Sequence, residues 1–488
     1  MTTLRSTSIA LLAIAALMFA SCSSGEQVAE PAAVGPTPTD DQMNWHEMEM
    51  NAFIHFTTNT FTDLEWGYGD ESPSIFNPSE LDAEQWVSTL KDAGFKGVIL
   101  TTKHHDGFCL WPSQYTEHSV KNSPYKDGKG DVVREVSDAC KKYGLKFGVY
   151  LSPWDRNMSE YGSEEYITYY RNQLEELLTG YGDVFEMWFD GANGGDGYYG
   201  GAREKRNIDN ATYYDWPTTI EFAKQFQPNM LFFSDAGPDI RWVGNERGFV
   251  GETNWNTITP DTLYAGKHGI NNILNTGSED GTHWVPGEVD VSIRPGWFYH
   301  AHEDDKVKTP EQLLDIYLTS VGRGSVLLLN MPPDRRGLIH ENDVESLKGF
   351  RELLDKTFAN NLIADAQVST SNTRGKANKF AATNLINQDK NSYWATDDGV
   401  TSATIDIDFN EPKLVSYILM QEYIKLGQRV KQFSIEAQGS DGNWQQIYSG
   451  TTIGYKLIAK VEPLETSKVR IHIQDSKAEI VMSNIEVY

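Results

Sequence analysis

The sequence predicts an α/β fold, a (β/α)8-like barrel, followed by an all-β sandwich. From residue 49 to about 357, short apolar segments alternate with stretches of helical periodicity, which is the pattern of parallel strands joined by helices. After about residue 360 the helical periodicity disappears, and short alternating segments are separated by turn residues. We therefore expect a barrel domain over residues 45–358 and a sandwich domain over residues 359–488.

Six segments are expected to be strands of the barrel. Each is a run of five or six mostly apolar residues, the usual length of a buried strand. In chain order they cover residues 51–56, 97–102, 147–151, 185–190, 230–235 and 326–330. The segment 256–296 has no clear pattern, so the sequence does not assign its strands.

The helices between these strands are indicated by their first and last residues. Asp82 with Gln85, and Thr309-Pro310 with Gln312, have the residue types of helix N-termini. The helix that begins near residue 132 is expected to end at Gly144, because glycine readily adopts the left-handed conformation found there. Further helices are expected over residues 164–178, up to residue 226 and over residues 341–357.

The first residues have the features of an export signal. Residues 1–21 contain an early positive charge at Arg5 and an apolar run that is too short to cross a membrane as a helix. The string that ends in Cys22 resembles a bacterial lipoprotein cleavage box, which predicts a lipidated Cys22 and a tether over residues 22–44. Ordinary secretion is the alternative. We expect an exported protein of the periplasm or cell surface that contacts the membrane only through this anchor.

The composition narrows the class of partner. The formal net charge of −27 argues against nucleic acid, whose binding requires basic clusters, and suits a neutral substrate. The 13 Trp and 23 Tyr favour carbohydrate only weakly, since such rings also fill large cores. Cys109 and Cys140 are the only cysteines after the leader, so no disulfide framework is expected.

One strand ends in a carboxylate that is well placed for catalysis. Residues 185–189 form a short apolar run that is followed by Asp190 and Gly191. In a (β/α)8 barrel the active site lies at the carboxyl ends of the strands, and a neighbouring glycine lets a substrate approach the backbone. Asp190 is therefore a candidate nucleophile. The alternative is that it caps the following turn.

Other strand ends and the loops beside them carry polar and aromatic residues that we expect at the same barrel mouth. They are His55, Glu65, Trp66, His104, His105, Tyr150, Trp188, Arg241, Glu246 and Trp297. Adjacent residues of an extended segment point to opposite sides, so His104 and His105 are not expected to share a metal ion. No other ligand set has the spacing of a metal site, so no metal is expected in the barrel.

Imidazole and indole groups suit sugar hydroxyls and the apolar face of a sugar ring. Hydrolysis of a glycoside then requires two carboxylates, and Asp190 is one of them. The second should be a Glu whose pKa is raised, so that it can donate a proton to the leaving oxygen. Glu246, Glu252 and Glu288 are the candidates, and their spacing does not choose among them.

Several separate strings over residues 45–357 resemble retaining α-L-fucosidases of glycoside hydrolase family 29. They are His55-Phe56 with Thr60-Phe61, Glu65–Gly67, Lys103–Phe108, Gly148–Tyr150 with Ser152–Trp154, Trp188–Ala192, Arg294–Tyr299 and Leu328–Pro333. The strings around His104 and Asp190 are specific when they occur together. The resemblance implies a two-step retaining mechanism in which Asp190 forms a glycosyl-enzyme and a Glu acts as acid and then as base.

The resemblance also implies roles for the other residues. His55, His104, His105 and Tyr150 would bind fucose hydroxyls beside Glu65 and Trp66, and Trp188 and Trp297 would lie against the ring. The string Gly244–Gly248 resembles the acid/base segment of family members that cut branched α-1,3/1,4-fucosides, which favours Glu246. Residues 237–242, which include Arg241, suggest the same subgroup. The Gly/Tyr-rich loop 194–214 is either a second contact for such glycans or a surface loop.

The C-terminal segment resembles discoidin-like carbohydrate-binding sandwiches in residues 369–371, 382–389 and 392–396. In such domains the Asp-rich loop often holds a structural calcium, so Asp389 is a candidate ligand. Trp394 is expected in the core rather than at a sugar-binding surface. The alternative role of this domain is to brace the barrel.

Together these observations predict an exo-acting α-L-fucosidase that acts on fucosylated oligosaccharides or glycoconjugates. No cofactor is expected for the reaction. One alternative is a retaining glycosidase for another neutral or deoxy sugar, and another is a non-catalytic glycan-binding surface lipoprotein.

Overall fold

The computed structural model describes residues 28–488. The predicted leader over residues 1–21 and the predicted lipidation at Cys22 lie outside the described residues. Within residues 28–488 no helix combines the length and apolar character that crossing a membrane requires.

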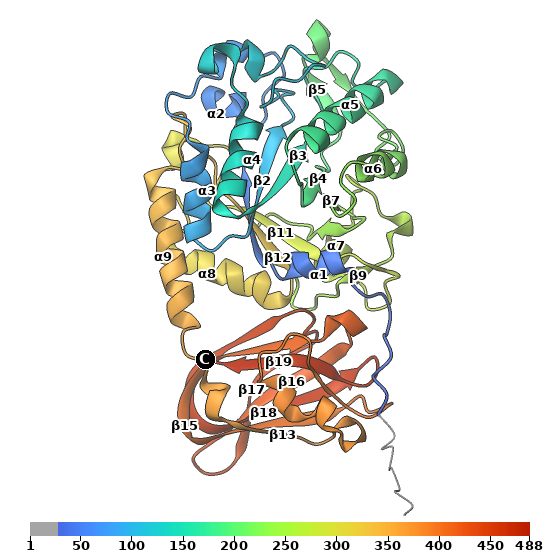
Figure 1. Ribbon diagram of the computed structural model, residues 1–488, viewed down its shortest axis with the longest axis vertical. Coiled ribbons are helices and arrows are strands. Elements are labelled where there is room, and N and C mark those ends of the chain that lie inside the picture. The colour runs from blue at the N-terminus through green and yellow to red at the C-terminus, as the bar shows by residue number, and fades with distance from the viewer. Residues whose placement is uncertain (1–27) are drawn as a thin grey trace, which may run out of the picture. The chain divides into compact units, whose positions relative to one another are not determined.

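In the described chain, eight strands form one closed parallel barrel in the order β1-β12-β11-β8-β7-β4-β3-β2 (Figure 1). Each strand pairs in parallel with both of its neighbours. The strands are β1 (Met50–Ile54), β2 (Gly97–Lys103), β3 (Lys146–Leu151), β4 (Glu186–Trp188), β7 (Leu231–Ser234), β8 (Ile240–Trp242), β11 (Gly287–Ser292) and β12 (Val326–Asn330). The predicted barrel is thus confirmed, and the two strands that sequence patterns did not assign are β8 and β11.

A short helix closes the bottom of the barrel. Helix α1 (Asp40–His46) begins inside the segment that was expected to be a tether, because Thr39 and Gln42 form a capping box there. Its Trp45 is buried among side chains of the barrel interior, and the indole Nε1 donates a hydrogen bond to Glu186 of β4 at 2.9 Å. Residues 40–44 of the predicted tether are therefore part of the folded barrel domain.

Six longer helices lie around the barrel (Figure 1). They are α3 (Ala83–Asp92), α4 (Val132–Tyr143), α5 (Glu164–Gly180), α6 (Trp216–Lys224), α8 (Pro310–Thr319) and α9 (Glu341–Thr357). Asp82 caps α3, Thr309 and Gln312 form a capping box on α8, and Gly144 ends α4 in the left-handed conformation. These three helix ends confirm the sequence prediction.

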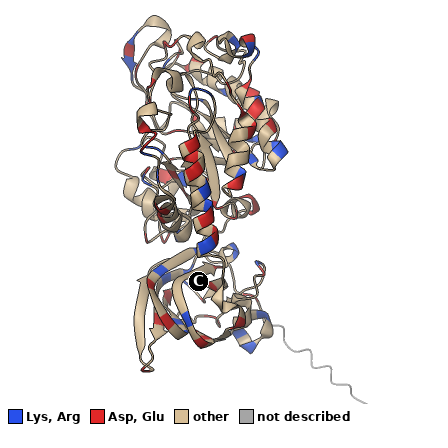
Figure 2. Cartoon of the chain, turned by 90° about the vertical axis from the view of Figure 1, so that its left-hand side faces the viewer, with Lys and Arg blue, Asp and Glu red and all other residues tan. Residues whose placement is uncertain are grey.

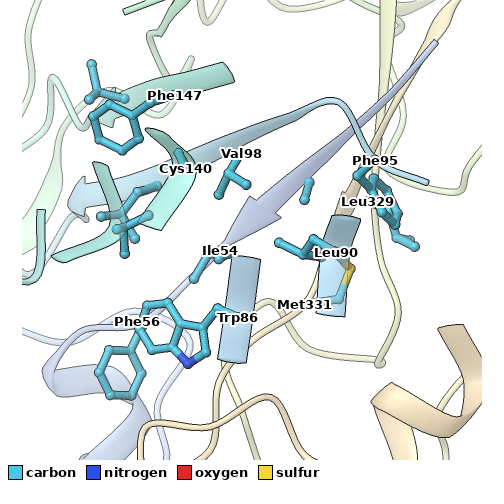
Figure 3. Packing of buried hydrophobic residues seen from close by; sticks show 14 of the residues in the cluster. Ile54, Phe56, Trp86, Leu90, Phe95, Val98, Cys140, Phe147, Leu329 and Met331 are labelled. Atoms are coloured by element: carbon cyan, nitrogen blue, oxygen red, sulfur yellow. The ribbon is translucent and has the colours of Figure 1, made fainter. Parts of the chain in front are cut away.

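The main core lies between the outer face of the strands and these helices. Figure 3 shows Ile54, Val98 and Leu329 from three neighbouring strands packed with Trp86 and Leu90 of α3. Cys109 and Cys140 are buried in this core as free thiols. Packing on the outer face leaves the upper interior of the barrel for functional side chains.

The C-terminal segment forms an antiparallel β-sandwich with its own core. Its strands are β13 (Gln367–Thr370), β14 (Trp394–Ala395), β15 (Ala403–Glu422), β16 (Val430–Gln438), β17 (Trp444–Gly450), β18 (Leu457–Ser476) and β19 (Val481–Val487). Trp394 is fully buried in that core and its Nε1 donates to the carbonyl of Asn372 at 3.0 Å, so the expectation that it is a core residue is confirmed.

The acidic composition is spread over the surface. On the face drawn in Figure 2, acidic and basic residues are interspersed along α9 rather than gathered into a basic patch. With the net charge of −27, this distribution gives a polyanion no continuous positive surface along that helix.

We predict that Trp86→Ala lowers the free energy of unfolding of the barrel by about 3–5 kcal/mol, because it opens a cavity in the core. It also removes the hydrogen bond from the indole to the carbonyl of Gly337. Urea titration followed by helix circular dichroism reports on the barrel, since the described α-helices all lie between residues 40 and 357. The exposed Asp92→Ala on the same helix should change stability by less than about 0.5 kcal/mol. Equal effects of the two substitutions would contradict this packing.

Candidate active site

A cavity of about 410 Å³ opens at the carboxyl ends of the barrel strands. This volume is within the range of small-ligand sites and suits a single sugar residue. The cavity is lined by nine of the residues predicted from the sequence: His55, Trp66, His104, His105, Tyr150, Trp188, Asp190, Glu246 and Trp297. Glu65, Arg241, Glu252 and Glu288 do not line it.

Asp190 is the second residue after the end of β4. Its carboxylate faces the cavity, and 25% of its side chain is exposed. The hydroxyl of Tyr150 donates to Oδ2 at 3.0 Å, and the backbone N–H of Ala192 donates to Oδ1 at 2.6 Å. His105 Nε2 lies 3.9 Å from Oδ2. These contacts fix the orientation of the carboxylate and show that it does more than cap its own turn.

Three histidine rings form one wall of the cavity. The rings of His104 and His105 are 4.1 Å apart, and those of His55 and His104 are 5.6 Å apart. The expectation that His104 and His105 point to opposite sides is therefore wrong. The reason is that β2 ends at Lys103, so the chain is no longer extended where these residues lie.

The histidines are held as neutral hydrogen-bonding groups. Burial lowers the pKa of His55 to about 3, and it also lowers the pKa of His104 and of His105. His55 Nδ1 contacts Asn330 Oδ1 at 2.8 Å and His105 Nδ1 contacts Ser152 Oγ at 2.7 Å. His104 Nδ1 is buried without a partner, so a ligand hydroxyl would satisfy it.

Glu246 is the one of the three candidate glutamates that lines the cavity. It lies on the loop after β8, and Trp297 Nε1 donates to its Oε2 at 3.2 Å. Burial raises the pKa of Glu246, the hydrogen bond from Trp297 opposes this rise, and the negative charge of Asp190 adds to it. A carboxyl group with a raised pKa beside an anion is suited to act as a proton donor.

The other two glutamates have different surroundings. Glu252 is exposed and pairs with Arg323 at 3.5 Å. Glu288 lies inside the barrel below the cavity, where Trp188 Nε1 donates to its Oε2 at 3.0 Å, and burial raises its pKa well above the usual value. Neither carboxyl reaches the cavity.

Glu65 and Arg241 hold loops rather than face the cavity. Glu65 accepts the backbone N–H groups of Trp297 and Phe298 at 2.8 and 3.1 Å, so it fixes the loop that presents the Trp297 ring. The buried guanidinium of Arg241 donates to the backbone carbonyls of Leu274 and Trp255, at 2.9 and 3.0 Å. Their positions do not support direct contact with a substrate.

Among the lining residues that were not predicted from the sequence, three carry polar side-chain groups: Asp235, Trp242 and Asp290. Trp242 Nε1 donates to Asp290 Oδ1 at 2.9 Å, and burial raises the pKa of Asp290 well above the usual value. Burial also raises the pKa of Asp235 to about 6. Asp235 is the last residue of the predicted strand 230–235, and this position was a signal that could have identified it.

The floor of the cavity is apolar. The ring of Trp188 stacks on Phe233 with their centroids 3.9 Å apart, and Phe53 packs against the same indole at 5.1 Å. These rings close the barrel interior beneath Asp190. Because the cavity is closed at its base, only one end of an extended ligand fits inside it, and the rest of the ligand stays in solvent.

These groups match the chemistry of acetal hydrolysis. The cavity holds a carboxylate fixed by donors, a second carboxyl group with a raised pKa, neutral imidazoles for hydroxyl groups and indole faces for an apolar ring surface. The described residues that line the cavity include one candidate nucleophile at a barrel strand end and one candidate proton donor on a neighbouring loop.

Comparison with known proteins gives a consistent result. A family model described as alpha-L-fucosidase matches residues 28–357, and a model described as F5/8 type C domain matches residues 366–485. The chain is 41% identical over 462 residues to alpha-L-fucosidase 1 of Arabidopsis thaliana, which covers 94% of this chain and 88% of that protein.

Solved structures extend this similarity over both domains. A glycoside hydrolase 29 family member from an unknown rumen bacterium has a TM-score of 0.84 at 46% identity, covering 94% of this chain and 78% of that one. A Ruminococcus gnavus GH29 fucosidase in complex with fucose has a TM-score of 0.84 at 33% identity, covering 95% of this chain and 97% of that one.

Proposed function

The chain belongs to the alpha-L-fucosidase family and is a glycoside hydrolase, and from this premise we propose that it releases terminal L-fucose from glycans by a retaining double displacement. The observation that carries the mechanism is the placement of Asp190 and Glu246 in one cavity with different environments. The first accepts hydrogen bonds from Tyr150 and Ala192, whereas the second has a raised pKa.

In the first step, a carboxylate oxygen of Asp190 attacks the anomeric carbon of the fucose. The bond from that carbon to the glycosidic oxygen breaks, and Glu246 gives its proton to the leaving oxygen. The product is a fucosyl ester of Asp190 and a glycan with a free hydroxyl. The Tyr150 hydroxyl orients the attacking carboxylate throughout this step.

In the second step, the ionised Glu246 takes a proton from a water molecule whose oxygen attacks the same carbon. The ester bond to Asp190 breaks, and fucose leaves with the configuration it had in the glycan. Both starting protonation states are then restored, so the described residues complete the cycle without any added group.

Recognition of the sugar relies on the cavity walls. The neutral rings of His55, His104 and His105 would exchange hydrogen bonds with fucose hydroxyls, and Trp297 would cover an apolar part of the ring. The floor of Trp188 and Phe233 admits one terminal residue, which supports an exo mode of action.

A preference for branched α-1,3/1,4-linked glycans is supported by Trp66 at the cavity mouth and by the loop 194–214. Trp66 lines the cavity and is 52% exposed, so it offers a ring surface toward the leaving part of the glycan. The loop 194–214 carries the strands β5 (Gly195–Gly197) and β6 (Glu204–Arg206) and is anchored through Tyr199, whose hydroxyl accepts from Trp154 Nε1 at 2.9 Å. A loop held in this way can contribute to a second sugar contact.

The proposal has two further parts, which concern export with lipidation and a calcium ion in the sandwich. Export and lipidation at Cys22 are supported by the apolar leader and the string before this cysteine. A structural calcium in the sandwich is supported by the turn at Asp389, whose carboxylate accepts the N–H of Asn391 at 3.0 Å and remains exposed.

We predict that Asp190→Ala lowers kcat/KM on an aryl fucoside by at least about a thousandfold, because the covalent route is lost. Steady-state kinetics measures the loss, and an unchanged circular dichroism spectrum shows that the fold survives. The matched control is the exposed Asp183→Ala just before β4, which should behave like the wild type. Turnover by the Asp190 variant within tenfold of wild type would exclude the assigned nucleophile.

We predict that Glu246→Ala lowers kcat/KM on natural fucosylated glycans by about 10²–10⁴-fold and affects nitrophenyl fucoside far less. A nitrophenolate leaves without a proton, whereas a sugar alkoxide needs a proton in order to leave. The comparison of the two substrates in parallel assays isolates proton donation from binding.

The pH dependence and a second variant serve as checks on this assignment. Because the pKa of Glu246 is raised, wild-type activity on glycans should hold below that pKa and fall as pH rises through it, and Glu246→Ala should lack this fall. Glu252→Ala should behave like the wild type. A selective loss in the Glu252 variant would move the acid/base to that residue.

We predict faster release of fucose from a Lewis-type trisaccharide than from an α-1,2-fucosylated oligosaccharide of equal size. The outer wall formed by Trp66 and loop 194–214 can contact the branch sugar only in the first substrate. Chromatography of the released fucose gives kcat/KM for both. A ratio near one, or the reverse preference, would reject the branched-substrate proposal and leave the fucosidase activity intact.

A further inference from the structure

A second cluster of metal-ligating side chains lies beside the loop that presents Trp297. Asp63, His300 and His302 each offer a ligand atom, and these atoms lie within 4.8 Å of one another. Asp63 ends α2 (Thr58–Thr62), and the two histidines flank the start of a 3-10 turn, Ala301–Glu303.

The contacts of His300 set the geometry of this cluster. Its Nδ1 lies 2.7 Å from Asp63 Oδ1, and its Nε2 lies 2.7 Å from Glu65 Oε1. The rings of His300 and His302 are 5.4 Å apart. His300 is almost fully buried, whereas His302 and Asp63 are exposed, so an ion from solvent can reach all three.

We propose that Asp63, His300 and His302 bind one divalent transition-metal ion, of the zinc type. His300 would bind through Nδ1 while its Nε2–H donates to Glu65. A carboxylate on the far nitrogen of a ligating histidine is the arrangement that orients imidazoles in metal sites. The ion takes the place of the proton shared by Nδ1 and Asp63, and a water molecule completes a tetrahedral set.

The donor set determines the kind of ion. Two imidazole nitrogens and one carboxylate suit Zn²⁺, Ni²⁺ or Cu²⁺, whereas Ca²⁺ and Mg²⁺ prefer six or more oxygen ligands. The charges also favour a cation, because the carboxylates of Asp63 and Glu65 both face His300, with Glu303 4.0 Å from His302. Arg335 is the opposing charge that acts on Asp63.

The site is connected to the catalytic cavity but is not part of it. Glu65, which orients His300, also holds the backbone N–H groups of Trp297 and Phe298. A bound ion would therefore tie the end of α2 to the loop that supports the Trp297 ring. Because this proposal concerns binding of an ion, it stands or fails independently of the fucosidase mechanism.

The test is a titration of untagged, metal-free protein with Zn²⁺ alone, in competition with a chromophoric chelator. We expect one ion per chain, and no displacement of that ion by excess Mg²⁺ or Ca²⁺. His302→Ala should weaken binding by more than about tenfold and leave turnover of aryl fucoside unchanged. Glu65→Gln keeps the three ligands and should weaken binding by about 10–100-fold, the usual effect of losing such an orienting group.

The exposed His283→Ala is the matched control and should bind Zn²⁺ as the wild type does. The proposal is overturned if the protein binds no stoichiometric Zn²⁺, or if His302→Ala binds it as tightly as the wild type. An equal loss in the His283 and His302 variants would also overturn it, because binding would then be unspecific. His302 is exposed, so its replacement is not expected to disturb folding.

Discussion

The site depends on keeping two carboxyl groups in different protonation states within one small cavity. Two negative charges in such a space disfavour each other, so a proton is retained more readily on the group whose carboxylate has fewer donors. Asp190 accepts hydrogen bonds from the Tyr150 hydroxyl and the Ala192 N–H, which hold its orientation. Glu246 has a single indole donor, and its pKa is raised. The surroundings thus separate a nucleophile from a proton donor.

One kind of contact, a hydrogen bond from an indole N–H to a carboxyl group, recurs from the base of the barrel to its mouth. Four acids accept a hydrogen bond from an indole N–H, in the pairs Trp45–Glu186, Trp188–Glu288, Trp242–Asp290 and Trp297–Glu246. The first three acids are buried, and Glu246 is exposed at the mouth. Burial raises the pKa of Glu186 to about 8 and the pKa of Glu288 and Asp290 well above the usual value. These raised pKa values limit the negative charge at the base and the wall of the cavity.

The sequence predicted the elements that follow a regular pattern of apolar and polar residues. It missed features whose position depends on where a strand ends or how a loop folds. The alternation of apolar strands and helices predicted the barrel, and the carboxylate after a strand identified Asp190. Strand β8 was missed because it has three residues and only residues 235–239 join it to β7. The spacing of the glutamates did not choose Glu246, because its position is set by a loop after that strand. The clustering of His104 with His105 required the exact end of β2, which periodicity does not give.

The most direct test of this account is to trap the covalent intermediate and locate it. A fucosyl fluoride with fluorine at C2 destabilises the cationic transition states, and the good leaving group still allows the first step. After peptic digestion, mass spectrometry should find one fucosyl adduct per chain, on the peptide that contains Asp190. A label on a peptide that contains Glu246, Asp235 or Asp290, or no label on an enzyme that consumes the fluoride, would contradict it.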